Sequence, residues 1–198
     1  VQKLEEGWCF QTQFLKQILI SPKNEHFKYL DENRKIIVGK SNSKSEIFDV
    51  LIFACRDIEK VFIPSSIKYI DSYAFSYCKK LKSIEFSKDS QILAFGKYSF
   101  SYCFLTNLTI PKTVEKLDKG WCRGNFKLKK VFISSESHHF KYLNEKNEVI
   151  VGKSKSGFFD EIKFANRDIN QVFIPSMIKY IDSFAFSECR LLKSIEFS

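Results

Sequence analysis

The sequence predicts an α/β fold: a right-handed leucine-rich-repeat solenoid with a concave parallel sheet, short helical turns and two inserted hairpins. The first observation behind this prediction is a long near-copy, because Val61–Ser87 returns as Val172–Ser198 with only five differences. The second is a shorter frame, Leu-x-x-Φ-x-Φ with Φ apolar, that recurs seven times. Because a repeated unit buries its apolar face against its neighbours, both observations indicate stacked coils.

The shorter frame sets the length of one coil. Successive frames end 43, 23, 24, 23, 41 and 23 residues apart. The short spacings fall within the roughly 20–29 residues that are typical of leucine-rich repeats. The frames end at Ile20, Ile63, Phe86, Ile110, Ile133, Ile174 and Phe197.

Each coil reads as a strand followed by a turn and a short helix. The alternation Φ-x-Φ predicts a strand whose middle side chain points outward. Pro64 follows such a strand, where its missing N–H removes no ladder hydrogen bond. Asp71-Ser72 then offers a cap for a short helical turn through Phe75. We expect Phe75 and its counterpart Phe186 to anchor these turns in the core.

A larger period divides the chain into two superrepeats, residues 1–113 and 114–198, within a single solenoid domain of residues 1–198. VQKLEEGWC at Val1 returns as VEKLDKGWC at Val114. The enlarged coils Ser21–Ile63 and Ser134–Ile174 each carry an extra HFKYL…IVGK segment, whose apolar runs around a polar turn predict a hairpin. Neither end resembles a polar cap, so we expect the chain to be a fragment of a longer protein.

Composition limits the classes of function. The 198 residues are 44% hydrophobic, which is enough to bury a core, and the net charge of +9 favours contact with polyanions. No run is long and apolar enough to cross a membrane, and no secretory signal is recognisable. The six cysteines are compatible with either redox compartment.

One slot in the repeat holds cysteine in several coils. Cys55, Cys78 and Cys189 lie three residues before the leading residue of a frame, and Cys103 lies two residues before Leu105. Other coils place Thr12, Asn125 and Asn166 in the same slot. A disulfide partner or metal ligand would not be exchanged so freely, so we predict small buried groups that bond to backbone. No C-x-x-C pair of the zinc type is present, and no metal site is predicted.

Two short motifs imitate cofactor or catalytic sites. Gly39-Lys40-Ser41 ends like a P-loop, but Arg34 stands where the first glycine of that loop is required. The same holds for Gly152-Lys153-Ser154, so no nucleotide cofactor is predicted. His26 and His139 open the hairpins without any accompanying nucleophile motif. We therefore expect no enzymatic activity and no small-molecule substrate.

The candidate binding residues are those that point away from the core along the strands. The middle positions of the frames are Leu19, Phe62, Glu85, Thr109, Phe132, Phe173 and Glu196, and the neighbouring open row includes Lys60, Lys130 and Gln171. Large apolar groups beside polar ones often mark a partner surface, whereas aromatic residues also suit strands by propensity alone. The binding hypothesis places two apolar ends, Leu19–Phe62 and Phe132–Phe173, around a polar centre.

The frame L-x-x-I-x-I-P followed by A-F-x-x-C, carried by Ile58–Cys78 and Ile169–Cys189, resembles the BspA-like leucine-rich-repeat family. The resemblance covers essentially the whole chain, and the departures are Trp8-Cys9 and Trp121-Cys122 where Ala-Phe is usual. Members are mainly surface or secreted proteins of anaerobic bacteria and parasitic protozoa, associated with adhesion to host cells and matrix. The resemblance thus implies a non-enzymatic binding module at the cell surface or secreted.

Two functions follow as hypotheses. The preferred one is a protein-interaction module whose concave sheet grips a protein or glycoprotein. The alternative is a binder of polyanions, such as sulfated glycan or nucleic acid, that uses the lysine excess. A steep loss of binding with added salt distinguishes the alternative from the preferred function.

Overall fold

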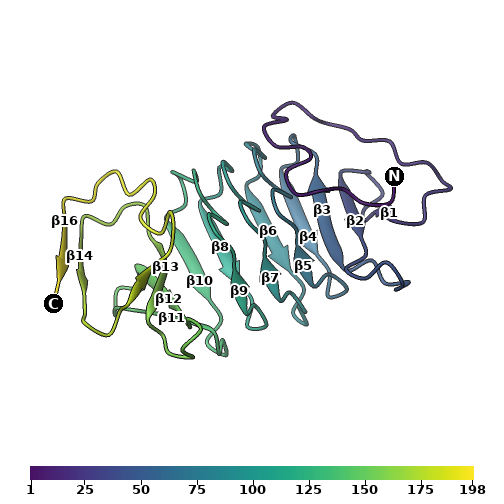
Figure 1. The fold of residues 1–198 in the computed structure, drawn as a ribbon. Helices are drawn as coiled ribbons and strands as arrows, with labels where there is room; N and C mark the ends of the chain where they lie inside the picture. The colour runs from purple at the N-terminus through teal and green to yellow at the C-terminus, as the bar shows by residue number, and fades with distance from the viewer.

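A computed structural model describes all residues 1–198 as a solenoid of β-strands and turns. The coils follow one another along one axis, with the two chain ends at opposite ends of the molecule (Figure 1). The largest buried cluster joins 29 residues, from Ile36 in the first superrepeat to Phe164 in the second. The same core therefore crosses the boundary between the two superrepeats.

Six of the seven predicted frames form strands on one face of the solenoid. These strands are β4 (Lys60–Ile63), β6 (Ser83–Phe86), β8 (Asn107–Ile110), β10 (Lys130–Ile133), β14 (Gln171–Ile174) and β16 (Ser194–Phe197). They pair in parallel as β4–β6, β8–β10 and β14–β16, so the expected sheet is divided into three two-stranded ribbons. The face that their outward side chains form is called the ladder face below.

A second face carries the shorter strands and both hairpins. The hairpins are β1 (Phe27–Tyr29) with β2 (Ile36–Gly39), and β11 (Phe140–Tyr142) with β12 (Val149–Gly152). Both hairpins form where the sequence predicts them. Each leads into a longer strand, and short strands follow: β3 (Val50–Ala54), β5 (Tyr69–Ile70), β7 (Ala94–Phe95), β9 (Lys116–Leu117), β13 (Glu161–Ala165) and β15 (Tyr180–Ile181). The two sheets have the orders β1-β2-β3-β5-β7-β9 and β11-β12-β13-β15.

The predicted short helices do not form, and the α/β assignment is therefore wrong: the chain contains no helix. The bend that holds Phe75 divides its backbone N–H groups between two uses. Every second N–H closes a tight turn within the coil, as in Ala74 N–H to the Asp71 carbonyl. The N–H groups between them donate to the next coil, as in Phe75 N–H to the Ser99 carbonyl at 2.8 Å. A helix would keep all these donors within its own segment, so stacking competes with helix formation and prevails.

This alternation requires backbone conformations that side chains usually avoid. Tyr73 and Tyr77 both have φ of +62°, and Gly120 and Gly124 occupy the equivalent positions in a later coil. A left-handed conformation is uncommon for a bulky residue. Here the tyrosine rings stack on those of the next coil, Tyr73 on Tyr98 and Tyr77 on Tyr102, with centroids 5.3 Å and 4.8 Å apart. Stacking between coils thus offsets part of the local strain.

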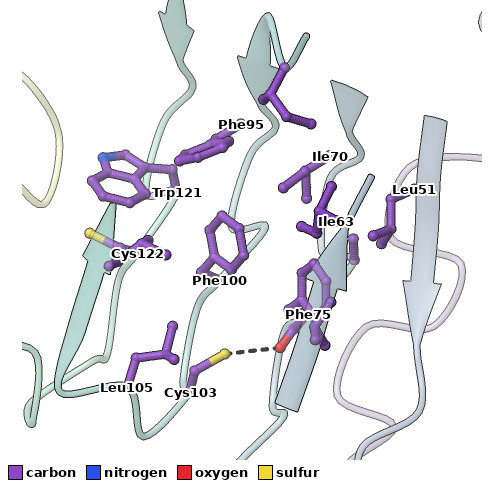
Figure 2. Close-up of a cluster of buried hydrophobic side chains, with 14 of the residues drawn as sticks. Leu51, Ile63, Ile70, Phe75, Phe95, Phe100, Cys103, Leu105, Trp121 and Cys122 are labelled. Atoms are coloured by element: carbon purple, nitrogen blue, oxygen red, sulfur yellow. Dashed lines mark hydrogen bonds between the residues drawn. The ribbon is translucent and has the colours of Figure 1, made fainter. Parts of the chain in front are cut away.

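The core inside the bends is aromatic (Figure 2). Phe75 is fully buried and its ring stacks on Phe100 with centroids 5.3 Å apart. Phe186, expected to be equivalent, is only half-buried and packs against a separate cluster of eight residues. The two phenylalanines therefore contribute unequally, because Phe75 has a packed coil on both sides.

The cysteine slot behaves as the sequence predicts. The Cys103 thiol donates to the Phe75 carbonyl of the preceding coil at 3.1 Å. Asn125 makes the equivalent bond to the Phe100 carbonyl at 2.6 Å, and Thr12 bonds to the Cys9 carbonyl at 2.6 Å. All six cysteines are free thiols. Burial raises the pKa of the Cys78 thiol to about 12, which keeps it protonated and unreactive.

Two buried arginines, which the repeat pattern does not reveal, fasten the enlarged coils. Arg56 donates to the carbonyls of Ala54 and Ala74 at 3.2 Å and 3.0 Å, and its other terminal nitrogen lies 3.2 Å from the Cys9 sulfur. Its guanidinium also lies over the Phe53 ring, 4.4 Å from the centroid. Arg167 repeats these contacts in the second superrepeat with Ala165, Ala185 and Cys122. Each arginine thereby links three consecutive coils.

We predict that Phe75→Ala lowers the free energy of unfolding by roughly 3–5 kcal/mol, the usual cost of truncating a buried aromatic residue. Phe186→Ala is expected to cost clearly less, because its ring is already partly exposed to water. Urea denaturation of the two variants beside the parent measures both values. A near-neutral Phe75→Ala variant, or a larger loss for Phe186→Ala, would contradict this assignment of the core.

We also predict that the folded protein needs no disulfide. Alkylation in denaturant without reductant should label six thiols by intact mass, and a reduced sample serves as the control. Labelling of the native protein should be much slower, since burial both shields the thiols and raises the pKa of Cys78 and Cys122 to about 12. Fewer than six labels, restored to six by reductant, would show that a disulfide exists.

Candidate functional site

The ladder face exposes large apolar side chains at one position of the repeat. Phe62, Phe132 and Phe173 are 59%, 42% and 53% exposed. Each occupies the middle of a strand whose apolar neighbours point inward, and Val61 and Ile63 on either side of Phe62 are buried. The period of two along a strand therefore directs the rings to solvent.

Each exposed ring has a polar neighbour on the adjacent strand. Phe62 lies opposite Glu85, and Phe132 lies opposite Thr109. Phe173 lies opposite Glu196. The rings are thus separate apolar points on a polar surface rather than a continuous stripe.

The structure does not bring the two predicted apolar pairs together on neighbouring strands. Leu19 is 74% exposed but belongs to no strand, and β10 and β14 are not paired. A tyrosine from each hairpin occupies the strand edge instead. The Tyr142 hydroxyl donates to the Val131 carbonyl at 2.8 Å and accepts from the Ile133 N–H at 3.1 Å. The hydroxyl thus makes the two hydrogen bonds that a neighbouring strand would otherwise make. The Tyr29 hydroxyl makes the same pair with Ile18 and Ile20.

The polar candidates of the open row also lie on this face. Lys60, Lys130 and Gln171 are exposed, each at the first position of its strand. The Lys130 ammonium lies 4.9 Å from the centroid of the Phe132 ring. This cation–π contact holds the lysine beside the aromatic ring, where both can meet the same partner group.

A recess of about 490 Å³ adjoins Phe173, and no sequence pattern predicts it. Its walls are the hairpin turn around Glu145 on one side and strands β14 and β16 on the other, including Gln171. The hairpin turn and β14 are far apart in the sequence and meet only because the enlarged coil folds back. Three glutamates and one lysine line the recess: Glu145, Glu148, Glu196 and Lys146.

Charges of both signs are interspersed on this side of the molecule. The Lys82 ammonium lies 2.8 Å from the Glu59 carboxylate and lowers the pKa of that carboxyl by donating a hydrogen bond to it. Lys60 and Lys130 are balanced by Glu85 and Glu196 on the outward rows. The ladder face therefore has no excess of either sign.

No three His, Cys, Asp or Glu side chains come together in a way that could hold a metal ion. No helix is both long and apolar enough to span a membrane.

Solved structures with a similar fold come from bacteria. The pneumococcal vaccine antigen PcpA is 26% identical over 72% of this chain and 34% of its own, with a TM-score of 0.64. A leucine-rich cell surface protein of Faecalibacterium prausnitzii is 21% identical over 71% of this chain and 42% of its own, with a TM-score of 0.58. A leucine-rich repeat protein of Eubacterium ventriosum is 21% identical over 73% and 42%, with a TM-score of 0.58. The chain thus spans well under half the length of these proteins.

The sequence shows significant similarity to no curated protein. A family model described as a BspA type leucine-rich repeat region matches six copies, over residues 45–147 and 158–198. The match covers more than half of the chain and includes both near-copies. The chain therefore belongs to the family of BspA type leucine-rich repeat proteins.

Proposed function

We propose that the chain is a non-enzymatic protein-interaction module of a cell-surface protein, and that its ladder face binds a protein or glycoprotein partner during adhesion. The binding residues in this proposal are Phe62, Phe132 and Phe173, with Leu19, Lys60, Lys130 and Gln171 beside them. We expect this face to lie on the concave side of a right-handed solenoid, where several coils at once can reach an extended partner.

The observation that carries the proposal is the repeated exposure of an aromatic ring at one register position. In strands β4, β10 and β14, the residues before and after the phenylalanine are buried or nearly buried. The ring between them is exposed to solvent. Leaving a phenylalanine exposed forgoes the roughly 1.5–3 kcal/mol that its full burial contributes. A partner that covers the rings recovers this free energy, and aromatic anchors often dominate the energy of an interface.

The recess beside Phe173 adds a place for a partner side chain. Its volume of about 490 Å³ accommodates a large residue, and its glutamates favour a partially positive or hydrogen-bond-donating group. An apolar ring at the rim of a polar recess is a combination found in the core and rim of protein interfaces.

Membership of a repeat family and the known relatives support the same class of function. Leucine-rich repeats are generally non-enzymatic scaffolds that expose a long surface to partners. The F. prausnitzii relative is described as a cell surface protein, and PcpA is described as a vaccine antigen. Adhesion and the identity of the partner are our extension of these descriptions to this chain.

The alternative, polyanion binding through the lysine excess, is not favoured on this face. The outward rows carry Lys60 and Lys130 together with Glu85 and Glu196. A polyanion requires a surface where positive charge is in excess.

We predict that the triple variant Phe62→Ser, Phe132→Ser and Phe173→Ser loses most adhesion to cultured cells and to immobilised matrix extract. Its stability should remain within about 1 kcal/mol of the parent, because changes at exposed positions are usually mild. Adhesion is measured by bound fluorescence, and stability by urea denaturation.

Phe14→Ser is the matched control, since Phe14 is 88% exposed but belongs to none of the ladder strands. It should adhere like the parent. A folded triple variant that adheres as well as the parent would exclude the ladder face as the binding surface.

A further inference from the structure

Each superrepeat sets two lysines on one phenylalanine ring, on the hairpin side of the molecule and away from the ladder face. In the first superrepeat, the Lys28 and Lys40 ammonium groups lie 4.4 Å and 5.1 Å from the centroid of the Phe48 ring. We call these three residues the first platform. Lys28 belongs to β1, Lys40 directly follows β2, and the Phe48 ring comes from the loop that leads into β3.

The second superrepeat repeats the arrangement closely. The Lys141 and Lys153 ammonium groups lie 4.6 Å and 5.1 Å from the centroid of the Phe159 ring. These three residues form the second platform. Both ammonium groups lie within 5.1 Å of the ring centroid, so an anion near the platform is attracted by both charges.

The two platforms differ in whether the chain itself supplies that anion. In the first, the Glu46 carboxylate lies 3.6 Å from the Lys40 ammonium. The corresponding loop of the second platform is two residues shorter and reads Ser154-Lys155-Ser156-Gly157, without any acidic residue. No carboxylate lies within 4.0 Å of Lys141 or Lys153, which leaves this pair open to an outside anion.

The recess beside the second platform also carries more positive charge than the equivalent recess beside the first. Lys153 borders a recess of about 210 Å³ lined by four lysines and three carboxylates. The equivalent recess beside Lys40 is lined by two lysines and three carboxylates. In the recess beside Lys153, Lys163 is already paired with Glu161 and Asp182, and Lys116 with Asp118. Lys119, which stands where the first superrepeat has Glu6, has no such partner and adds free positive charge beside Lys153.

An exposed aromatic residue adjoins the second platform in the sequence. Phe158 is 70% exposed and directly precedes Phe159. A sulfated sugar matches this set of groups, because a pyranose has an apolar C–H face and carries its anionic groups around the edge. The face can stack on Phe158 while sulfate oxygens meet the ammonium groups of Lys141 and Lys153.

We infer that the second platform is a binding site for a sulfated glycan. In the first platform Glu46 neutralises part of the Lys40 charge, so we expect that platform to bind the glycan more weakly. The site lies on another surface from the one proposed for the protein partner and does not depend on it. A surface protein with both surfaces could hold a glycan chain and a protein at the same time.

The test measures binding of a heparin hexasaccharide by calorimetry at physiological salt. The variant Lys141→Gln with Lys153→Gln should bind about tenfold more weakly than the parent, since two charge-assisted contacts are lost. The variant Lys28→Gln with Lys40→Gln removes the same charge from the first platform and should stay within about twofold of the parent. Desulfated hexasaccharide should not bind the parent.

A loop exchange provides a second test that leaves all the platform lysines in place. Replacing Lys155–Gly157 with Asn42–Glu46 gives the second platform the loop that the first already carries, so the fold is expected to tolerate it. Binding should again fall about tenfold, as Glu46 in its new position competes with sulfate. Thermal unfolding shows whether each variant is folded. If the variant with Lys141→Gln and Lys153→Gln is unfolded, the loop exchange tests the inference in its place.

Three outcomes would overturn the inference: a parent that does not bind the hexasaccharide, an equal loss of affinity in both lysine variants, or undiminished binding after the loop exchange. Tighter binding of a single-stranded DNA of equal charge would instead assign the platform to nucleic acid and also reject the glycan. The triple Phe→Ser variant of the ladder face should bind the hexasaccharide like the parent. The two proposed surfaces can therefore fail separately.

Discussion

The hydrogen bonds between successive bends are the interaction on which the rest of the structure depends. Tyr73, Phe75 and Tyr77 each donate their backbone N–H to the next coil, at 2.8–2.9 Å. Because these groups are buried, a coil that slipped along its neighbour would leave donors unsatisfied. The bends thereby fix the register in which side chains stack, including the aromatic core. The left-handed backbone at Tyr73 strains a bulky residue, but it points these N–H groups toward the next coil.

The enlarged coils interrupt the hydrogen bonding between neighbouring coils. In each enlarged coil, one tyrosine and one arginine side chain supply hydrogen bonds in its place. Tyr142 supplies a hydroxyl rung at the edge of β10, where no strand follows. Arg167 supplies guanidinium donors to carbonyls of its own coil and the next. A buried guanidinium without a carboxylate partner is unusual, and here carbonyls, thiols and an aromatic ring at 4.4 Å surround it. The insertion therefore stays compatible with stacking on both sides in both superrepeats.

The two superrepeats share their buried contacts but differ in their surface loops. Arg56 and Arg167, Tyr29 and Tyr142, and the two platforms share their internal contacts closely. The loops that follow the hairpins, between β2 and β3 and between β12 and β13, differ in length and charge, with Glu46 present in the first and no counterpart in the second. Core positions are constrained by close packing, whereas a loop on the surface tolerates such changes at little cost in stability. The second superrepeat can thus acquire a binding property that the first lacks while both keep one fold.

The sequence by itself determined the solenoid, six of the seven strand frames, the positions of both hairpins and the inward or outward direction of Phe62, Phe132 and Phe173. These features follow from periodicity, which acts within a few residues along the chain. It also indicated the role of the cysteine slot, because exchange with Asn and Thr reveals a small hydrogen-bonding group. Only the tertiary structure decided that the bends are not helical, that β10 and β14 do not pair, that Arg56 is buried, and where the recess beside Phe173 lies. Each of these features depends on contacts between neighbouring coils. The spacing of residues within one coil does not determine those contacts.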